Sequence, residues 1–154
     1  MNFLRNTLAI FVGLAVAFLI ITIGIRLNPS WITYEQFTPY KNWEHVLKSV
    51  EHKPYFFVAL LVSSGIASTV GGVVAAMIVK YAKVAYAILI GFILLFIAML
   101  DIIIFPYHPT FYKIIIFLIF FPFAWMGGKI TEVIYERNKK RKLRELQKQK
   151  NAVK

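Results

Sequence analysis

Asp101 and His108 are the two side chains of this sequence whose types and positions are best suited to chemistry. Asp101 is the only acid well inside an apolar run, and it lies about four residues, or ~6 Å of helix, from the end of that run. An ionisable side chain at membrane depth is a functional hypothesis by default, so Asp101 could carry a proton or bind a cation. Its shallow position also fits a simpler interpretation, in which the carboxylate meets water, Lys113, Arg26 or the turn that holds His108.

Elsewhere in the chain, the residue types and their spacing do not indicate a metal site or a catalytic site. His45 and His52 are seven residues apart on one helical face, about 10 Å, whereas helical zinc sites use i, i+4 spacing. The absence of cysteine excludes thiolate ligands and cysteine nucleophiles. No nucleophile elbow, zinc-protease motif or phosphate-binding loop occurs. The sequence therefore predicts no catalytic site, no metal site and no cofactor.

A stripe of small residues recurs every four positions in the second apolar run. Its members are Ser64, Ser68, Gly72 and Ala76, and Gly91 is a counterpart in the third run. Small residues at this spacing let two helix backbones approach closely in lipid. We expect the stripe to make this run the central helix of a bundle. Two alternatives are an interface between copies of the chain and a conduction path lined by hydroxyl side chains, namely Ser63, Ser64, Ser68 and Thr69.

Four long apolar runs must position these residues. The chain has 154 residues, 59% of them hydrophobic and only 16% charged, which a soluble core could not bury. The runs cover about residues 8–25, 56–79, 84–105 and 111–128, each close to the ~20 residues that cross a membrane. Backbone groups cannot stay unpaired in lipid, so the runs are helical. The predicted fold is an all-α, four-helix transmembrane bundle, residues 1–128.

The loop 26–55 is expected to hold a short amphipathic helix on the outer surface. Thr38 is a suitable N-cap, Pro39 suits the first helical position, and Pro54 ends the segment. One face is apolar through Trp43, Val46, Leu47 and Val50. Such a helix would lie on the membrane or cap the bundle. An aromatic belt is expected at the same interface, formed by Trp31, Tyr34, Tyr40, Trp43, Tyr55 and Tyr107.

A basic tail, residues 129–154, dominates the net charge of +11, since ten of the 18 Lys and Arg lie in it. Together with Arg5, Lys80 and Lys83 it places 13 cations on one side, against five on the other, so both termini are predicted to be cytoplasmic. We expect the tail to continue the last span as a helix that contacts anionic lipid or a protein partner, and not nucleic acid. The contact residues would be Arg137, Lys139, Lys140, Arg141, Lys142 and Arg144.

Three further segments have a distinctive composition: the glycine- and alanine-rich run from Gly65 to Ala76, the Pro-His-Pro-aromatic turn from Phe105 to Tyr112, and the closing segment from Phe121 to Lys129. Together they resemble an uncharacterised family of small four-span bacterial inner-membrane proteins. The resemblance covers most of residues 60–129. It implies a four-span fold in a bacterial inner membrane and implies no activity.

The sequence favours a non-enzymatic membrane protein that serves as a structural or accessory subunit of a membrane assembly. The alternative is a small oligomeric transporter or channel in which Asp101 and the hydroxyls of the second span line a path. The two differ in partner, since the first requires another protein and the second a homo-oligomer.

Overall fold

The structure, a computed structural model, describes residues 2–26 and 39–152. This part of the chain forms five helices and no strand: α1 (Asn2–Arg26), α2 (Pro39–Val50), α3 (Pro54–Ile78), α4 (Lys83–Ile104) and α5 (Thr110–Ala152). All but α2 are long and apolar enough to cross a membrane, which confirms the all-α bundle with four spanning helices. Thr38, Trp31 and Tyr34 lie outside the described residues, as does the side chain of Tyr40.

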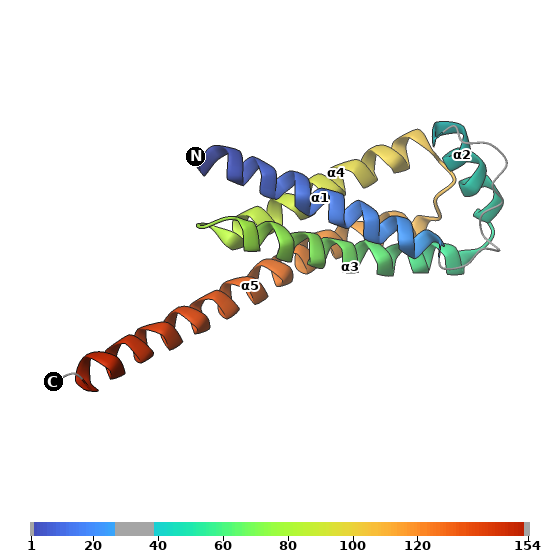
Figure 1. The fold of residues 1–154 in the computed structure, drawn as a ribbon. Coiled ribbons are helices and arrows are strands. Elements are labelled where there is room, and N and C mark those ends of the chain that lie inside the picture. The colour runs from blue at the N-terminus through green and yellow to red at the C-terminus, as the bar shows by residue number, and fades with distance from the viewer. Residues whose placement is uncertain (1, 27–38, 153–154) are drawn as a thin grey trace.

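The central position expected for the second span is occupied by α3, which packs against α1, α4 and α5. In the most apolar stretch of α3 56% of residues are buried, against 22%, 28% and 33% in the other three. Figure 1 shows α3 between α1 and α5, with the start of α1 and the end of α5 at one end of the bundle and α2 at the other. We call these the arm end and the α2 end.

Small residues of α3 form two packing faces rather than one broad stripe. On the first, a Cβ at Gly71 would lie only 2.8 Å from the carbonyl oxygen of Gly13, so α1 and α3 cross in backbone contact. On the second, Gly72 faces Ala124 of α5 and Ala87 of α4, and the Ser68 hydroxyl donates to the Phe120 carbonyl at 3.0 Å. Gly91 of α4 meets Ala124 as well. Close approach of this kind is how helices associate without a hydrophobic driving force.

The amphipathic helix α2 begins at Pro39, as predicted, and caps the bundle rather than lying apart from it. Leu47 and Val50 are fully buried in the same apolar core as residues of α1, α3, α4 and α5, and Trp43 and Val46 pack against that core. The helix ends at Val50, before the predicted stop at Pro54. Pro54 is instead the first residue of α3, a position that suits proline because the missing N–H would be unpaired there.

The arm end is closed by Lys83, at the tight turn between α3 and α4. Ala82 takes the left-handed conformation, with φ of 53°, and turns the chain back. The Lys83 ammonium then donates to the Ala76 and Val79 carbonyls at 2.7 and 2.8 Å, and it lies 4.7 Å from the centre of the Tyr135 ring. A buried cation thus satisfies carbonyls left open at the C-terminus of α3.

Candidate functional site

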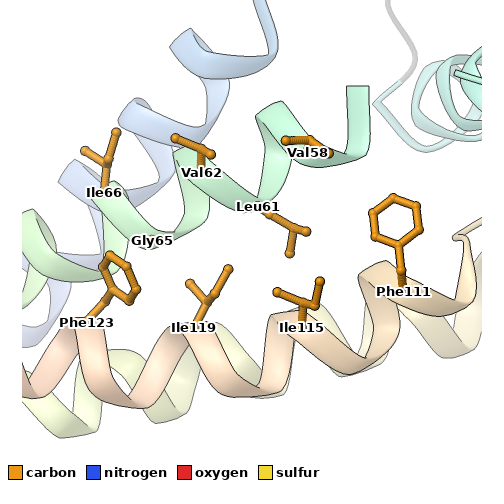
Figure 2. Close-up of a pocket in the computed structure, with 9 residues that line it drawn as sticks. All are labelled: Val58, Leu61, Val62, Gly65, Ile66, Phe111, Ile115, Ile119 and Phe123. Carbon is orange, nitrogen blue, oxygen red and sulfur yellow. The ribbon is translucent and has the colours of Figure 1, made fainter. Parts of the chain in front are cut away.

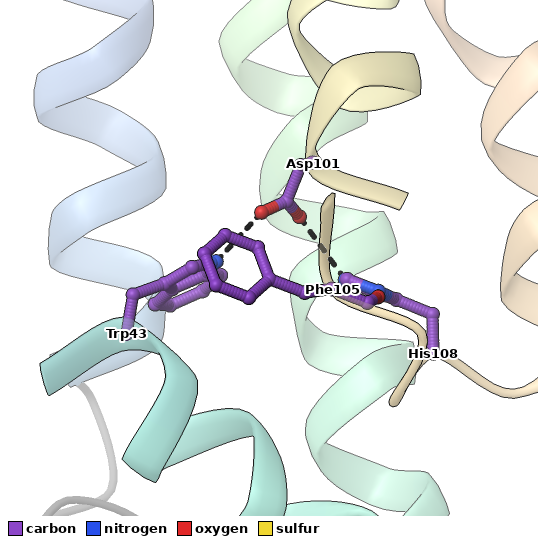
Figure 3. A network of polar contacts seen from close by, with 4 residues as sticks. All are labelled: Trp43, Asp101, Phe105 and His108. Carbon is purple, nitrogen blue, oxygen red and sulfur yellow. Dashed lines mark hydrogen bonds and ion pairs between the residues drawn. The ribbon is translucent and has the colours of Figure 1, made fainter. Parts of the chain in front are cut away.

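A polar cluster at the α2 end joins three elements through Asp101. The carboxylate projects from the last turn of α4, where its backbone carbonyl accepts the Phe105 N–H at 2.9 Å and ends the helix. The chain then turns over residues 105–109, which brings His108 back toward α4. Trp43 arrives from α2. Figure 3 shows the indole and the imidazole on opposite sides of the Asp101 carboxylate.

Each oxygen of Asp101 has its own partner. The Trp43 indole Nε1–H donates to Oδ1 at 2.7 Å, and His108 Nε2 lies 3.0 Å from Oδ2. The imidazole is fully buried, whereas the carboxylate keeps 22% of its surface exposed. Within the described chain Nε2 makes no aligned hydrogen bond, so its contact with Oδ2 is an ion pair by distance. The structure therefore brings together the two residues singled out in the sequence.

The contact of His108 with the Phe105 carbonyl shows which ring nitrogen carries a hydrogen. Nδ1 lies 2.8 Å from the Phe105 carbonyl oxygen, which can only accept, so Nδ1 carries a hydrogen. Nε2 then faces a carboxylate, and a lone pair there would be repelled. At 3.0 Å the contact between Nε2 and Oδ2 is favourable only if a hydrogen lies on one of these two atoms.

Aromatic rings hold the imidazole in place. Tyr112 stacks on it, with ring centres 5.1 Å apart and an angle of 22°, and Phe57 of α3 meets it edge-on at 5.8 Å. Phe57 and Tyr112 contact each other at 5.6 Å. These contacts fix the ring orientation, so that the direction of Nε2 toward Asp101 is set by packing.

A second polar link fastens α2 to the same turn. The Tyr107 hydroxyl donates to Glu44 Oε1 at 3.2 Å, and the Lys48 ammonium lies 2.8 Å from the same oxygen and 5.3 Å from the Tyr107 ring centre. The hydrogen bond and charge of Lys48 lower the pKa of Glu44, and the hydrogen bond to Glu44, then Tyr107, raises the pKa of Lys48. Two adjacent residues of α2, Trp43 and Glu44, are thus each tied to the α4–α5 region.

Chemically, the cluster can hold one proton and fasten α2 to the turn. No group of three His, Cys, Asp or Glu side chains that could hold a metal occurs in the described residues, and His45 and His52 are exposed on or just after α2. The partners foreseen for Asp101 included the turn with His108, and this is where His108 meets it.

Sequence reasoning missed two residues. Trp43 was assigned to an apolar face and an interfacial belt, yet its indole N–H makes the shortest contact to Asp101. The available signal was that a tryptophan buried against a core needs an acceptor for that N–H. Lys83 was counted as one of several cations in a turn, whereas it is 8% exposed and caps α3. Its signal was a lysine five positions after the end of a helix that has no basic residue in its last turn.

The basic residues of the tail that the structure describes, all but Lys154, lie on a single helix, because α5 runs from Thr110 to Ala152 without interruption. Figure 1 shows α5 continuing past the other helices at the arm end and diverging from them. The side chains singled out in the sequence are all exposed: Arg137, Lys139, Lys140, Arg141, Lys142 and Arg144. They are remote from Asp101, which lies at the α2 end.

The fold defines an integral membrane protein with four spanning helices, a capping helix at one end and an exposed basic helix at the other. No family model, no curated protein and no solved structure matches the chain.

Proposed function

We propose that the protein is a non-enzymatic accessory subunit of a membrane assembly, and that its basic helix binds an acidic surface of a partner protein. The observation that carries the proposal is the unbroken continuation of α5 beyond the bundle. We call residues 129–152 the arm. A continuous helix that extends from a membrane bundle presents its side chains at regular positions, as a docking element requires.

The arm carries an ordered basic face. Residues three or four apart lie on the same side of a helix, so five cations form one stripe about 16 Å long. They are Arg137, Lys140, Arg141, Arg144 and Lys148, all of them exposed. The stripe includes three arginines, whose guanidinium groups bind carboxylates with two parallel hydrogen bonds. An acidic protein surface matches this chemistry.

The length of the arm favours a protein partner over the lipid surface. From Lys129 to Ala152 the helix extends about 35 Å, and Arg137 to Arg144 lie about 12–22 Å along it. Attraction to anionic headgroups falls off within a Debye length, which is about 8 Å at physiological ionic strength. Lys129 remains close enough for lipid contact, whereas a helix that continues the direction of its span carries the stripe beyond that range.

The cation imbalance between the two ends supports a location in a bacterial inner membrane with the arm in the cytoplasm. The short turn and the arm place most Lys and Arg at the arm end, as the positive-inside rule requires for cytoplasmic loops. A reporter fused after Lys154 should be active only in the cytoplasm. Activity on the opposite side would overturn this orientation.

The transporter alternative has weaker support from the geometry. The Ser68 hydroxyl donates to the Phe120 carbonyl, and the Thr69 hydroxyl donates to the Gly65 carbonyl, so both are engaged within the bundle. The small-residue faces of α3 are covered by α1, α4 and α5 of the same chain. A homo-oligomer would therefore use other surfaces than this stripe.

The decisive experiment is native co-purification from membranes with the full chain and two charge-matched variants. One replaces Arg137, Arg141 and Arg144 with Glu on the stripe; the other replaces Lys139, Lys142 and Lys150 with Glu on the opposite face. We expect a stoichiometric partner protein with the wild type and the second variant, and its loss with the first. Absence of any partner, or equal loss in both variants, would refute docking through the stripe.

A further inference from the structure

An apolar groove runs along the outside of the bundle between α3 and α5. Figure 2 shows Leu61 of α3 pointing toward Ile115 of α5, and Phe123 of α5 directed toward α3. The other lining residues are Val58, Val62, Gly65, Ile66, Phe111 and Ile119. Its volume is about 360 Å³, within the range of about 300–1,000 Å³ typical of ligand pockets. The exposed lining is entirely apolar. The part of a ligand that lies in this groove must therefore be apolar, such as a hydrocarbon chain.

Gly65 is a lining residue at which α3 and α5 approach closely, because a Cβ there would lie only 3.3 Å from Ile119 and from Phe123. The exposed side chains on either side, such as Val62 and Ile115, form the walls.

The length and position of the groove match one leaflet of a bilayer. Phe111 and Phe123 are twelve residues apart, about 18 Å along the helix, and one leaflet of a ~30 Å hydrocarbon layer is ~15 Å thick. Phe111 and Val58 lie close to the first residues of α5 and α3, so the groove begins at the α2 end. It extends from there toward the middle of the bundle.

The dimensions favour a single chain over a helix from another protein. Counted to the surfaces of the lining atoms, the groove holds about 710 Å³ of space. A helix about 10 Å across would fill roughly 1,400 Å³ over the same 18 Å, about twice as much. A neighbouring helix could place only individual side chains in it. A flexible alkyl chain follows its full length and buries apolar surface on both walls.

Tyr55 supplies a polar group at the open end. It lies three residues before Val58, on the same face of α3, and its side chain is 80% exposed. Tyrosine at this level of a membrane places its ring in the hydrocarbon boundary and its hydroxyl among the headgroups. The hydroxyl can donate to an ester or phosphate oxygen of a lipid whose chain lies in the groove.

We propose that this groove is a binding site for one acyl chain of a phospholipid from the leaflet at the α2 end, with the headgroup beside Tyr55. The test uses the full chain purified in mild detergent, with native mass spectrometry to count retained phospholipids as activation is raised. We expect one phospholipid to survive conditions that remove all others.

Two variants fill the groove from opposite walls, Ile115→Trp from α5 and Val62→Phe from α3. Both should lower the one-lipid fraction by about tenfold. The matched control is Leu118→Trp, which adds the same ring on α5 outside the groove, at a side chain 69% exposed. Circular dichroism identifies any variant that has lost its helices, and the remaining groove variant then decides the result.

Three results would overturn the proposal. Lipid retention in both groove variants equal to that of the wild type would place the lipid elsewhere. If the wild type lost all its lipids at the same activation energy, none of them would be bound more tightly than ordinary boundary lipid. A dimer that is lost in the groove variants would show that a second copy of the chain covers this face.

Discussion

The indole nitrogen of Trp43 and the carboxylate of Asp101 are joined by a 2.7 Å hydrogen bond, although 58 positions separate them in the chain. The bond connects the capping helix α2 to the end of α4. Because the same carboxylate contacts His108, Asp101 connects the cap, the spanning helix and the turn. We therefore interpret the cluster first as a structural link, consistent with an accessory role.

Removal of this bond should loosen α2 without unfolding the bundle. Trp43→Phe keeps an aromatic ring against the core, but the ring is smaller and has no N–H donor, which leaves Oδ1 of Asp101 without this partner. Hydrogen bonds to charged groups contribute about 1.5–3 kcal/mol. We expect amide hydrogen exchange in residues 43–50 to accelerate correspondingly.

The matched control is Trp125→Phe, at an exposed position on the membrane-facing side of α5. It should leave exchange in α2 unchanged. Unaltered exchange in Trp43→Phe would show that the cap is held without this bond, by apolar packing and the contact between Glu44 and Tyr107.

Asp101 and His108 should act as a unit in stability measurements. Asp101→Asn and His108→Gln each remove one side of the proton-sharing pair and leave a buried polar atom unmatched, at about 1–3 kcal/mol each. The double variant should lose clearly less than the sum, since neither group then lacks its partner. Thermal unfolding in detergent gives the three values. Additive losses would mean that the 3.0 Å contact contributes no coupling.

Much of the fold follows from the sequence because hydrophobic runs of membrane length have one solution in lipid. The four spans, the amphipathic helix from Pro39 and the helical continuation of the last span all match the predicted segments. The predicted end of the amphipathic helix was wrong, because proline both breaks a preceding helix and begins a following one. Local sequence does not distinguish these two roles.

The sequence predicted two residues of the site but not the contacts that Trp43 and Lys83 make. Asp101 and His108 stood out because ionisable groups are rare in such runs, whereas Trp43 and Lys83 did not. Their roles depend on which elements meet, Trp43 with α4 and Lys83 with the end of α3. Contacts between distant segments leave no periodic signal in a single sequence, so only the structure reveals them.

Gly91 should be among the least replaceable residues of the bundle. A Cβ at this position would lie 2.6 Å from the Ala124 Cβ and 2.8 Å from the Phe120 carbonyl oxygen, and a backbone atom cannot move aside cheaply. Overpacking of a tight core typically destabilises by about 1–3 kcal/mol. Gly91→Val should thus lower the thermal midpoint in detergent. Ala85→Val, at an exposed position of α4, should have little effect, and equal midpoints would exclude close packing of α4 on α5 here.

The ion pair between Glu44 and Lys48 predicts how the stability of the fold changes as the pH falls. Lys48 lowers the pKa of Glu44 below its usual value of 4.5, so this pair stabilises the fold above that pH. The contribution is lost as pH falls through the lowered pKa. We expect wild type and Glu44→Gln to differ in stability near neutral pH and to converge in acid. A difference that grew as the pH fell would contradict the assignment.

Substitution of Lys83 tests whether a buried ammonium group stabilises the arm end of the bundle. Lys83→Met keeps most of the aliphatic stem and removes the donor to the Ala76 and Val79 carbonyls. Those carbonyls form the negative end of the α3 dipole, so the loss should be about 1–2 kcal/mol. Lys80→Met, in the same turn but exposed, changes the charge equally and provides the control. Thermal unfolding should separate the two variants. Equal midpoints would show that Lys83 contributes through charge alone and not through its contacts with α3.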